Sequence, residues 1–216
     1  MNVIIFGPPG AGKGTQSKNI TNDFNLVQLS TGDLFRKEIN NKTELGKKIE
    51  TLINSGKLVS DEIVNNLIED IILNSSISNK FLFDGYPRTL PQVYTLDKIL
   101  KGLGQKISIV ISLNVDQQVI IKRINGRIIC TKCFKIFNEY FNPPDSKDHL
   151  CKREFLEKRP DDSAKTIINR FQNYISKTKP ILEYYKKKGS LCEIDGNKKI
   201  DEIYDRIKGI LNNIRH

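Results

Sequence analysis

The sequence predicts an α/β fold in which a parallel five-stranded sheet is covered by helices. Three observations support this prediction. Short apolar runs recur along the chain, amphipathic segments long enough for helices separate them, and a glycine-rich loop follows the first run. Unbroken apolar runs are typical of parallel strands that are buried on both faces. Their alternation with helices indicates a sheet that is wound on both sides.

The predicted elements follow in order along the chain. The strands are expected at residues 3–6, 26–29, 81–84, 107–113 and 191–194. The helices are expected at residues 13–24, 31–40, 44–54, 61–73, 90–100, 116–124, about 163–188 and 199–214. Start signals support several of them, since Ser60 precedes two acidic residues and Asp116 precedes Gln117.

One segment, residues 126–162, breaks the alternation. It contains three of the four cysteines, several prolines and a group of aromatic residues. We expect a small β-rich insertion here rather than another part of the main sheet.

Composition limits the class of protein. A chain of 216 residues can bury one substantial core. The first apolar run is short and leads directly into the glycine-rich loop, and no run approaches the ~18–20 apolar residues of a membrane span. We therefore expect a cytoplasmic protein without a membrane partner. The net charge of +10 fits either a polyanionic ligand or a lysine-rich surface.

The glycine-rich loop has the layout of a phosphate-binding P-loop. Its sequence, Gly-Pro-Pro-Gly-Ala-Gly-Lys-Gly-Thr, occupies residues 7–15 between a strand and a helix. The glycines allow the backbone N–H groups to converge on one anion, the helix adds the positive end of its dipole, and Lys13 adds a charge for the outer phosphates. A plain glycine-rich turn is the alternative, but the flanking strand and helix favour binding of a nucleoside triphosphate.

Charged side chains also follow two other predicted strands: Asp84 at the end of one, and Asp33 and Arg36 after another. Asp84 ends an apolar strand, where its carboxylate would hold the water shell of Mg²⁺ at the same edge as the loop; the alternative is a simple Asp-Gly turn. Asp33 is a second candidate for that water shell. Arg36, about one turn into the predicted helix of residues 31–40, would bind a second phosphate. The alternative is that the preceding Ser-Thr-Gly-Asp stretch, residues 30–33, is only a helix cap.

Taken together, these blocks resemble adenylate kinases, and the resemblance runs essentially end to end. The matching residues are 7–16, 30–33, Arg36, 56–59, 84–88, Gln92, Arg123, Arg127, Arg159, 161–162 and Arg170. The resemblance implies a P-loop NTPase fold with a helical AMP-binding insertion and a β-rich lid. It also implies reversible Mg²⁺-dependent phosphoryl transfer from ATP to AMP, giving two ADP, by a monomer.

The resemblance implies two nucleotide sites. The expected ATP-binding residues are Gly10, Ala11, Gly12, Lys13, Gly14, Thr15, Arg123, Arg127, Ile136, Phe137 and Lys198. The expected AMP-binding residues are Thr31, Arg36, Lys57, Leu58, Val59, Gly85, Tyr86, Pro87, Arg88, Gln92, Arg159 and Arg170. The amide of Gln92 could read an adenine edge, which needs both a donor and an acceptor, although spacing alone would place it on a solvent-facing helix surface.

The expected catalytic residues are all cations. They are Lys13, Arg88, Arg123, Arg159 and Arg170. Phosphoryl transfer depends on positioning and on neutralisation of charge, so cations that gather when a lid closes suit it. Any one of these arginines, taken alone, is more typical of a surface residue. The prediction of a catalytic role depends on the arginines as a set. No catalytic base is expected, because the AMP phosphate is already anionic.

The cysteine-rich insertion predicts a structural zinc site. Cys130 and Cys133 form a C-x2-C pair, Cys151 follows, and Glu154 occupies the fourth position. Such a pair in a reducing compartment indicates zinc more often than a disulfide. His149 is the rival fourth ligand, and a reduced, metal-free lid is the alternative to the whole site.

We expect three parts: a core of residues 1–29, 60–125 and 163–216, an AMP-binding segment of residues 30–59, and a lid of residues 126–162. Another nucleoside monophosphate kinase, such as one that uses GTP to phosphorylate AMP, is the nearest rival. A zinc-knuckle module that binds nucleic acid is a distant one, because it leaves the P-loop and the arginines unexplained. We expect ATP, AMP and ADP as partners and no nucleic acid.

Overall fold

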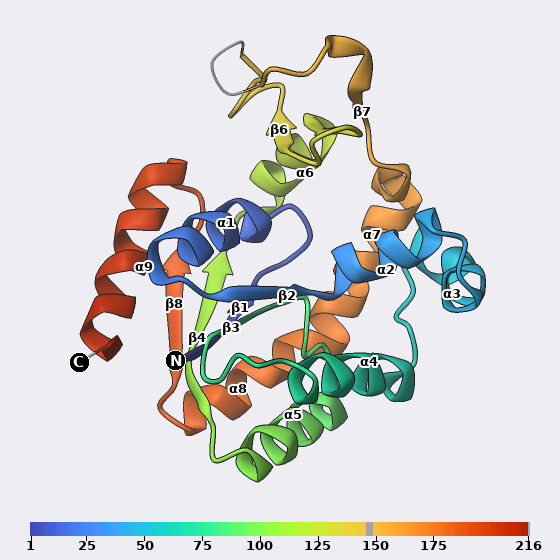
Figure 1. Ribbon diagram of the computed structural model, residues 1–216. Coiled ribbons are helices and arrows are strands. Elements are labelled where there is room, and N and C mark those ends of the chain that lie inside the picture. Colours follow the sequence, from blue (N-terminus) through green and yellow to red (C-terminus); the bar gives the residue numbers. More distant parts are fainter. Residues whose placement is uncertain (146–148, 216) are drawn as a thin grey trace.

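The computed structural model describes residues 1–145 and 149–215 (Figure 1). Its main sheet contains β1 (Asn2–Phe6), β2 (Val27–Ser30), β3 (Phe81–Asp84), β4 (Ile107–Asn114) and β8 (Leu191–Asp195). They lie in the order β2-β3-β1-β4-β8, and each neighbouring pair is parallel. The predicted fold class is therefore confirmed, with each strand within a residue or two of its expected place.

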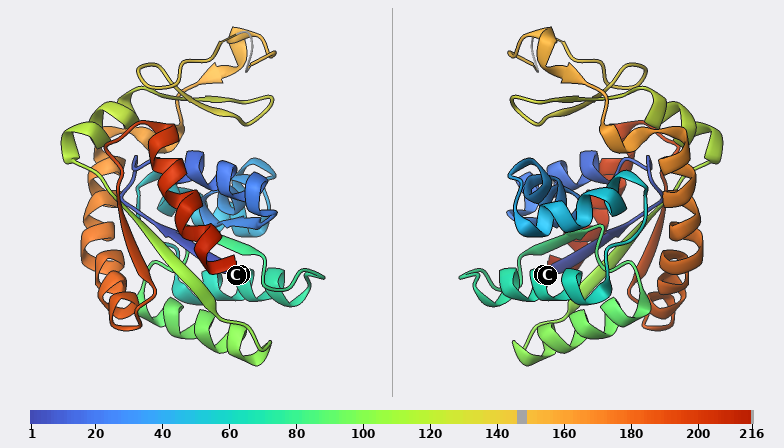
Figure 2. Two further views of the ribbon diagram at one scale, coloured as in Figure 1. Left: turned by 90° about the vertical axis from the view of Figure 1, so that its left-hand side faces the viewer. Right: turned by 90° about the vertical axis from the view of Figure 1, so that its right-hand side faces the viewer.

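Helices cover both faces of the sheet, as Figures 1 and 2 show. The helices of the core are α1 (Lys13–Phe24), α4 (Asp61–Leu73), α5 (Leu90–Gly102), α6 (Gln117–Asn125), α7 (Ala164–Asn173), α8 (Lys179–Lys187) and α9 (Ile200–Arg215). Side chains alternate along β1, so Val3 and Ile5 pack toward α1 and α9 while Ile4 and Phe6 pack toward α4, α5 and α8. Two hydrophobic cores result, one on each face of the sheet.

Two short helices, α2 (Thr31–Asn40) and α3 (Glu44–Asn54), follow β2 and form the helical insertion. Ser30 caps α2 by accepting a hydrogen bond from the Asp33 N–H, and Thr43 caps α3 by accepting one from the Gly46 N–H. The two helices approach closely at Gly46, where a Cβ atom would lie 2.2 Å from the carbonyl oxygen of Glu38.

The cysteine-rich insertion forms a second sheet, which stands apart from the main one (Figure 2). It consists of β5 (Arg127–Cys130), β6 (Ile136–Asn138) and β7 (Leu156–Glu157), paired antiparallel in the order β6-β5-β7. The chain enters this sheet from α6 and leaves it through a short 3₁₀ turn, Pro160–Asp162, into α7. Residues 146–148 of the expected lid and His216 of the expected core lie outside the described residues.

The long helix expected over residues 163–188 is interrupted. A π-helical segment, Tyr174–Thr178, separates α7 from α8. Pro180 lies in the first turn of α8; its nitrogen carries no hydrogen and therefore cannot donate to the preceding turn. Within the described residues, the chain contains no helix both long enough and apolar enough to span a membrane.

Candidate active site

The P-loop wraps from the carboxyl end of β1 into α1. Gly10 (φ +81°) and Gly12 (φ +92°) adopt left-handed conformations that disfavour other residues, and a Cβ atom on Gly10 would lie 2.7 Å from Ile124. Gly12 precedes α1 and offers no side-chain cap, so the first N–H groups of the helix face the loop. These glycine conformations and the uncapped start of α1 are compatible with the predicted anion-binding loop.

Lys13 folds back over this loop. Its ammonium donates to the carbonyl oxygens of Gly7, at 2.7 Å, and Pro8, at 3.1 Å. Burial lowers the pKa of Lys13 to about 8, since Asp84 only partly offsets the loss of water and Arg88 and Arg170 oppose the charge. An anion bound in the loop would favour the charged form.

Asp84 lies at the carboxyl end of β3, where it is 8% exposed. Its Oδ2 accepts hydrogen bonds from Ser17 Oγ, at 3.2 Å, and Gln28 Nε2, at 3.1 Å. Burial raises the pKa of this carboxyl, and the ammonium of Lys13 opposes the rise. Asp33, the other expected magnesium residue, is more exposed and pairs with Arg36 at 2.6 Å.

A pocket lies beside the P-loop, between the helical insertion and the core. Its lining includes nine of the expected AMP-binding residues: Thr31, Arg36, Lys57, Leu58, Val59, Gly85, Arg88, Gln92 and Arg170. Of the other three, Pro87 lines a second pocket, and the buried Tyr86 turns its hydroxyl toward Asn65, at 2.8 Å. Arg159 lines neither pocket, although it is buried close by.

The second pocket contains Lys13 and Gly7 and adjoins the first. Both pockets share Arg88 and Arg170 in their walls. Burial and the nearby Arg170 lower the pKa of Arg88 to about 10, so the two guanidinium groups are held close together against their mutual repulsion. Two adjoining pockets with shared cations suit two anionic groups that must approach each other.

Two consecutive carboxylates, Asp161 and Asp162, pair with Arg36, Arg127 and Arg170. Asp161 Oδ2 accepts from Arg170 Nη1 at 2.9 Å and lies 3.7 Å from Arg36 Nη1. Asp162 forms a two-pronged ion pair with Arg127, in which Arg127 Nε donates at 2.7 Å. Burial and the nearby Arg127 lower the pKa of Arg159 to about 10. The folding of the chain therefore gathers arginines from α2, from the small sheet and the connection that follows it, and from α7.

Of the remaining predicted ATP residues, Arg123 and Ile136 lie close to the start of α1. Arg123 Nη1 donates to the Ala11 carbonyl oxygen at 3.2 Å, and Ile136 lies close to Gly14, where an added Cβ would be 3.9 Å from its Cδ1. Phe137 is buried and packs edge-on against His149, so its ring is occupied inside the small sheet. Lys198 is exposed in the loop before α9.

The structure also shows contacts that the sequence did not reveal. Thr166 Oγ1 donates to the Asn54 carbonyl oxygen at 2.7 Å. Further along α7, Asn169 and Asn173 donate to the carbonyl oxygens of Ser55 and Gly56, both at 2.9 Å. These side chains lie at intervals of three and four residues, and therefore on one face of α7. They bind the end of α3, just before the pocket wall formed by residues 57–59.

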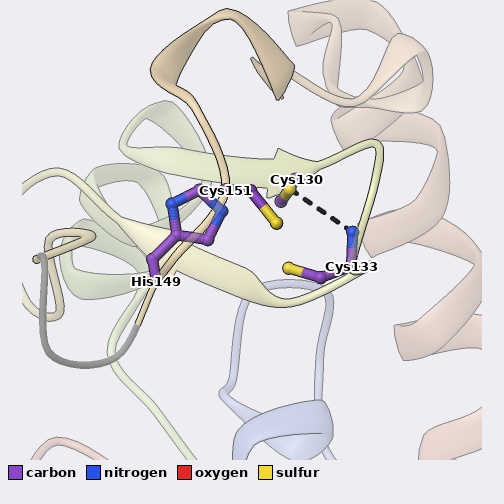
Figure 3. Close-up of side chains that lie close together, drawn as sticks. All are labelled: Cys130, Cys133, His149 and Cys151. Atoms are coloured by element: carbon purple, nitrogen blue, oxygen red, sulfur yellow. Dashed lines mark hydrogen bonds between the residues drawn. The ribbon is translucent and has the colours of Figure 1, made fainter.

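Three cysteines and a histidine converge in the small sheet (Figure 3). One potential ligand atom from each of Cys130, Cys133, His149 and Cys151 lies within 4.8 Å of all the others. Burial opposes the charged form of the Cys130 thiol, but hydrogen bonds, including one from the Cys133 N–H at 3.4 Å, lower its pKa to about 6. This donor set suits a tetrahedral zinc ion.

The expectation of Glu154 as the fourth ligand needs correction. Its carboxylate lies outside the group, is 63% exposed and faces Lys152 at 3.9 Å. A short 3₁₀ turn, Arg153–Phe155, directs it toward solvent, whereas His149 is buried against Phe137. Nε2 of His149 is a buried nitrogen without a hydrogen-bond partner among the described residues. The rival ligand is therefore the one that the fold brings to the cysteines.

Comparisons with known proteins agree with this geometry. A family model described as adenylate kinase matches residues 5–190. An adenylate kinase from Pelagibacter ubique (strain HTCC1062) is 48% identical over 211 residues, which cover 98% of this chain and 99% of that protein. An adenylate kinase from Caldanaerobacter subterraneus subsp. tengcongensis is 41% identical over 213 residues, covering 98% and 96%. One from Clostridium botulinum (strain 657 / Type Ba4) is 39% identical, covering 98% of each chain.

Proposed function

The chain belongs to the adenylate kinase family, and we propose how its residues perform the reaction of that family. It catalyses reversible phosphoryl transfer from ATP to AMP, which yields two ADP. The observation that carries the assignment of sites is the pair of adjoining pockets that share Arg88 and Arg170. ATP would place its phosphates on the P-loop pocket, and AMP would occupy the pocket beside Gln92.

Each cation has a role set by its place. Lys13, held at the P-loop, binds the outer phosphates of ATP, and Arg36 binds the phosphate of AMP. Arg88 and Arg170 lie between the two nucleotides and neutralise the charge that builds up as the phosphates meet. Arg123 contacts the P-loop from α6, and Arg127 and Arg159 come from the small sheet and its exit.

The donor site also suits Mg²⁺ held through water. Asp84 is a buried carboxylate beside Lys13, and burial raises its pKa because Lys13 and its hydrogen bonds compensate its charge only in part. A hydrated cation would stabilise that charge, with Asp33 at the outer edge of the water shell. When bound with ATP, Mg²⁺ neutralises the phosphate oxygens.

We assign three parts to the enzyme, with the boundaries stated from the sequence: the core, the AMP-binding segment of residues 30–59, and a lid of residues 126–162. The small sheet and its short connections support the lid. Cys130, Cys133, His149 and Cys151 would hold a structural zinc ion, which would stabilise a sheet too small to form a core of its own. A thiolate site suits the cytoplasm, where thiols stay reduced. Both pockets are built from one chain, so a monomer suffices.

A coupled assay with purified protein tests the function. ATP, AMP and Mg²⁺ should yield ADP, and Lys13→Met should reduce kcat/KM by at least about a hundredfold, as expected for loss of a charge that binds the reacting phosphates. GTP as donor and UMP, CMP and GMP as acceptors form the comparison panel. Absence of ADP formation by folded protein would refute the proposal, and a preference for GTP would favour the rival donor.

A further inference from the structure

The amide of Gln92 has a protein partner at each end. Its Nε2 donates to Asp61 Oδ1 at 2.7 Å, and its Oε1 accepts from the Arg88 N–H at 2.7 Å. The residue is 2% exposed and belongs to the wall of the AMP pocket. Both contacts lie within the wall of the protein itself, so they are present before a nucleotide arrives.

These two partners determine which way the amide faces. A carboxylate oxygen accepts hydrogen bonds, and a backbone N–H only donates them. If the amide were turned over, its nitrogen would face the Arg88 N–H and its oxygen would face the Asp61 carboxylate, and both hydrogen bonds would be lost. The amide orientation is therefore set from both sides.

Each end of the amide can make one more hydrogen bond. Nε2 carries a second hydrogen, and Oε1 has a second lone pair. A fixed donor beside a fixed acceptor matches the edge of adenine, whose N1 accepts and whose 6-amino group donates. Hypoxanthine presents the reverse, because its N1 carries a hydrogen and its 6-oxygen accepts. The direction of the amide therefore distinguishes the two bases.

Building on the proposed AMP site, we propose that Asp61 is the positioning residue that sets the base selectivity of the acceptor pocket. Asp61 begins α4, and its Oδ2 accepts from Thr89 Oγ1 at 2.9 Å. Thr89 in turn caps α5, the helix that carries Gln92. The carboxylate is thus held at both oxygens against α5, and it acts on the base only through Gln92.

The test compares AMP with inosine monophosphate, which differs from AMP only at this edge of the base. Affinities of both are measured by displacement calorimetry on the wild-type chain and on Asp61→Ala, Asp61→Asn and the control Glu62→Ala, which removes the exposed neighbouring carboxylate. We expect Asp61→Ala to lower the ratio of AMP to inosine monophosphate affinity about tenfold, equivalent to about 1.4 kcal/mol. Asp61→Asn keeps an acceptor and should retain an intermediate ratio, while Glu62→Ala should match the wild type.

Affinity for ATP, expected to stay within about twofold of the wild type, shows that each variant is folded. A selectivity ratio unchanged in Asp61→Ala, or lowered equally in Glu62→Ala, would overturn the inference. If Asp61→Ala fails to fold, the ratio of Asp61→Asn decides. Because the readout is binding, it is separate from turnover: a wild-type chain that formed no ADP would refute the proposed function and would leave the comparison of affinities valid.

Discussion

The contacts between α7 and the end of α3 lead to the most detailed prediction. Asn169 and Asn173 each donate one hydrogen bond of 2.9 Å to a backbone carbonyl, at Ser55 and Gly56. Residues 57–59, which follow immediately, form a wall of the AMP pocket. The perturbation is the double variant Asn169→Ala/Asn173→Ala, which removes two of the three hydrogen bonds that anchor the end of α3 to α7 and leaves only that of Thr166.

The magnitude follows from the number of bonds lost. A hydrogen bond in a partly buried position contributes about 1 kcal/mol net. Two bonds therefore amount to about 2 kcal/mol, which corresponds to at most about a thirtyfold change if the whole loss falls on AMP binding. We expect a rise of about tenfold in KM for AMP, because water replaces part of the lost interaction. KM for ATP should rise by less than KM for AMP: Asn173 also lines the P-loop pocket, but neither lost hydrogen bond ends on a residue of the P-loop.

Steady-state kinetics with each nucleotide varied in turn measures both constants. Gln172→Ala is the matched control, because it removes an exposed amide from the neighbouring position of α7. Equal increases in KM for AMP and ATP would refute the reasoning, since they would indicate general loosening of the fold. An unchanged KM for AMP would show that the anchor does not serve the pocket.

Three further predictions follow. In the nucleotide-free protein, burial lowers the pKa of Lys13 to about 8, so above that pH the binding of ATP should be accompanied by uptake of a proton, and KM for ATP should rise with pH. Calorimetry in buffers of different ionisation enthalpy measures the proton uptake. No uptake at pH ~9 would contradict this prediction. Purified protein should carry about one zinc per chain, which His149→Ala should lose and Glu154→Ala should keep; equal zinc contents in the two variants would contradict the ligand set. Gly46→Ala should reduce the free energy of unfolding by about 1–3 kcal/mol, measured in urea, because its Cβ would meet a backbone carbonyl at 2.2 Å. Gly209→Ala, which would meet nothing within 4 Å, should not destabilise, and an equal loss there would rule out the steric explanation.

Much of the fold could be predicted because its signals are local. Apolar runs marked the strands of the main sheet, and the start signals at Ser60 and Asp116 lie where α4 and α6 begin, although neither side chain makes a capping hydrogen bond. The one helix that was predicted too long, over residues 163–188, contains a π-helical segment before Pro180. The proline was visible in the sequence, but the way in which the helix would accommodate it was not.

The candidate site likewise has a part that could be predicted from the sequence and a part that could not. The P-loop could be identified from the sequence because its glycines, its lysine and its flanking elements act within one short segment. The choice of His149 over Glu154 could not, because spacing does not say which side chain a short turn directs inward. The role of Asp61 was equally hidden, because it depends on a contact between α4 and α5, which are separated by β3.

The amino-acid sequence by itself therefore determined the class of fold, the glycine-rich loop and the basic residues that we propose to bind phosphate, since each depends on the residue types and on neighbours close along the chain. Only the tertiary structure decided which side chains meet: Arg88 and Arg170 between the two pockets, His149 beside the three cysteines, and Asp61 against the amide of Gln92. The physical reason is that hydrogen bonds and ion pairs act over a few ångströms, and the packing of distant elements sets those distances.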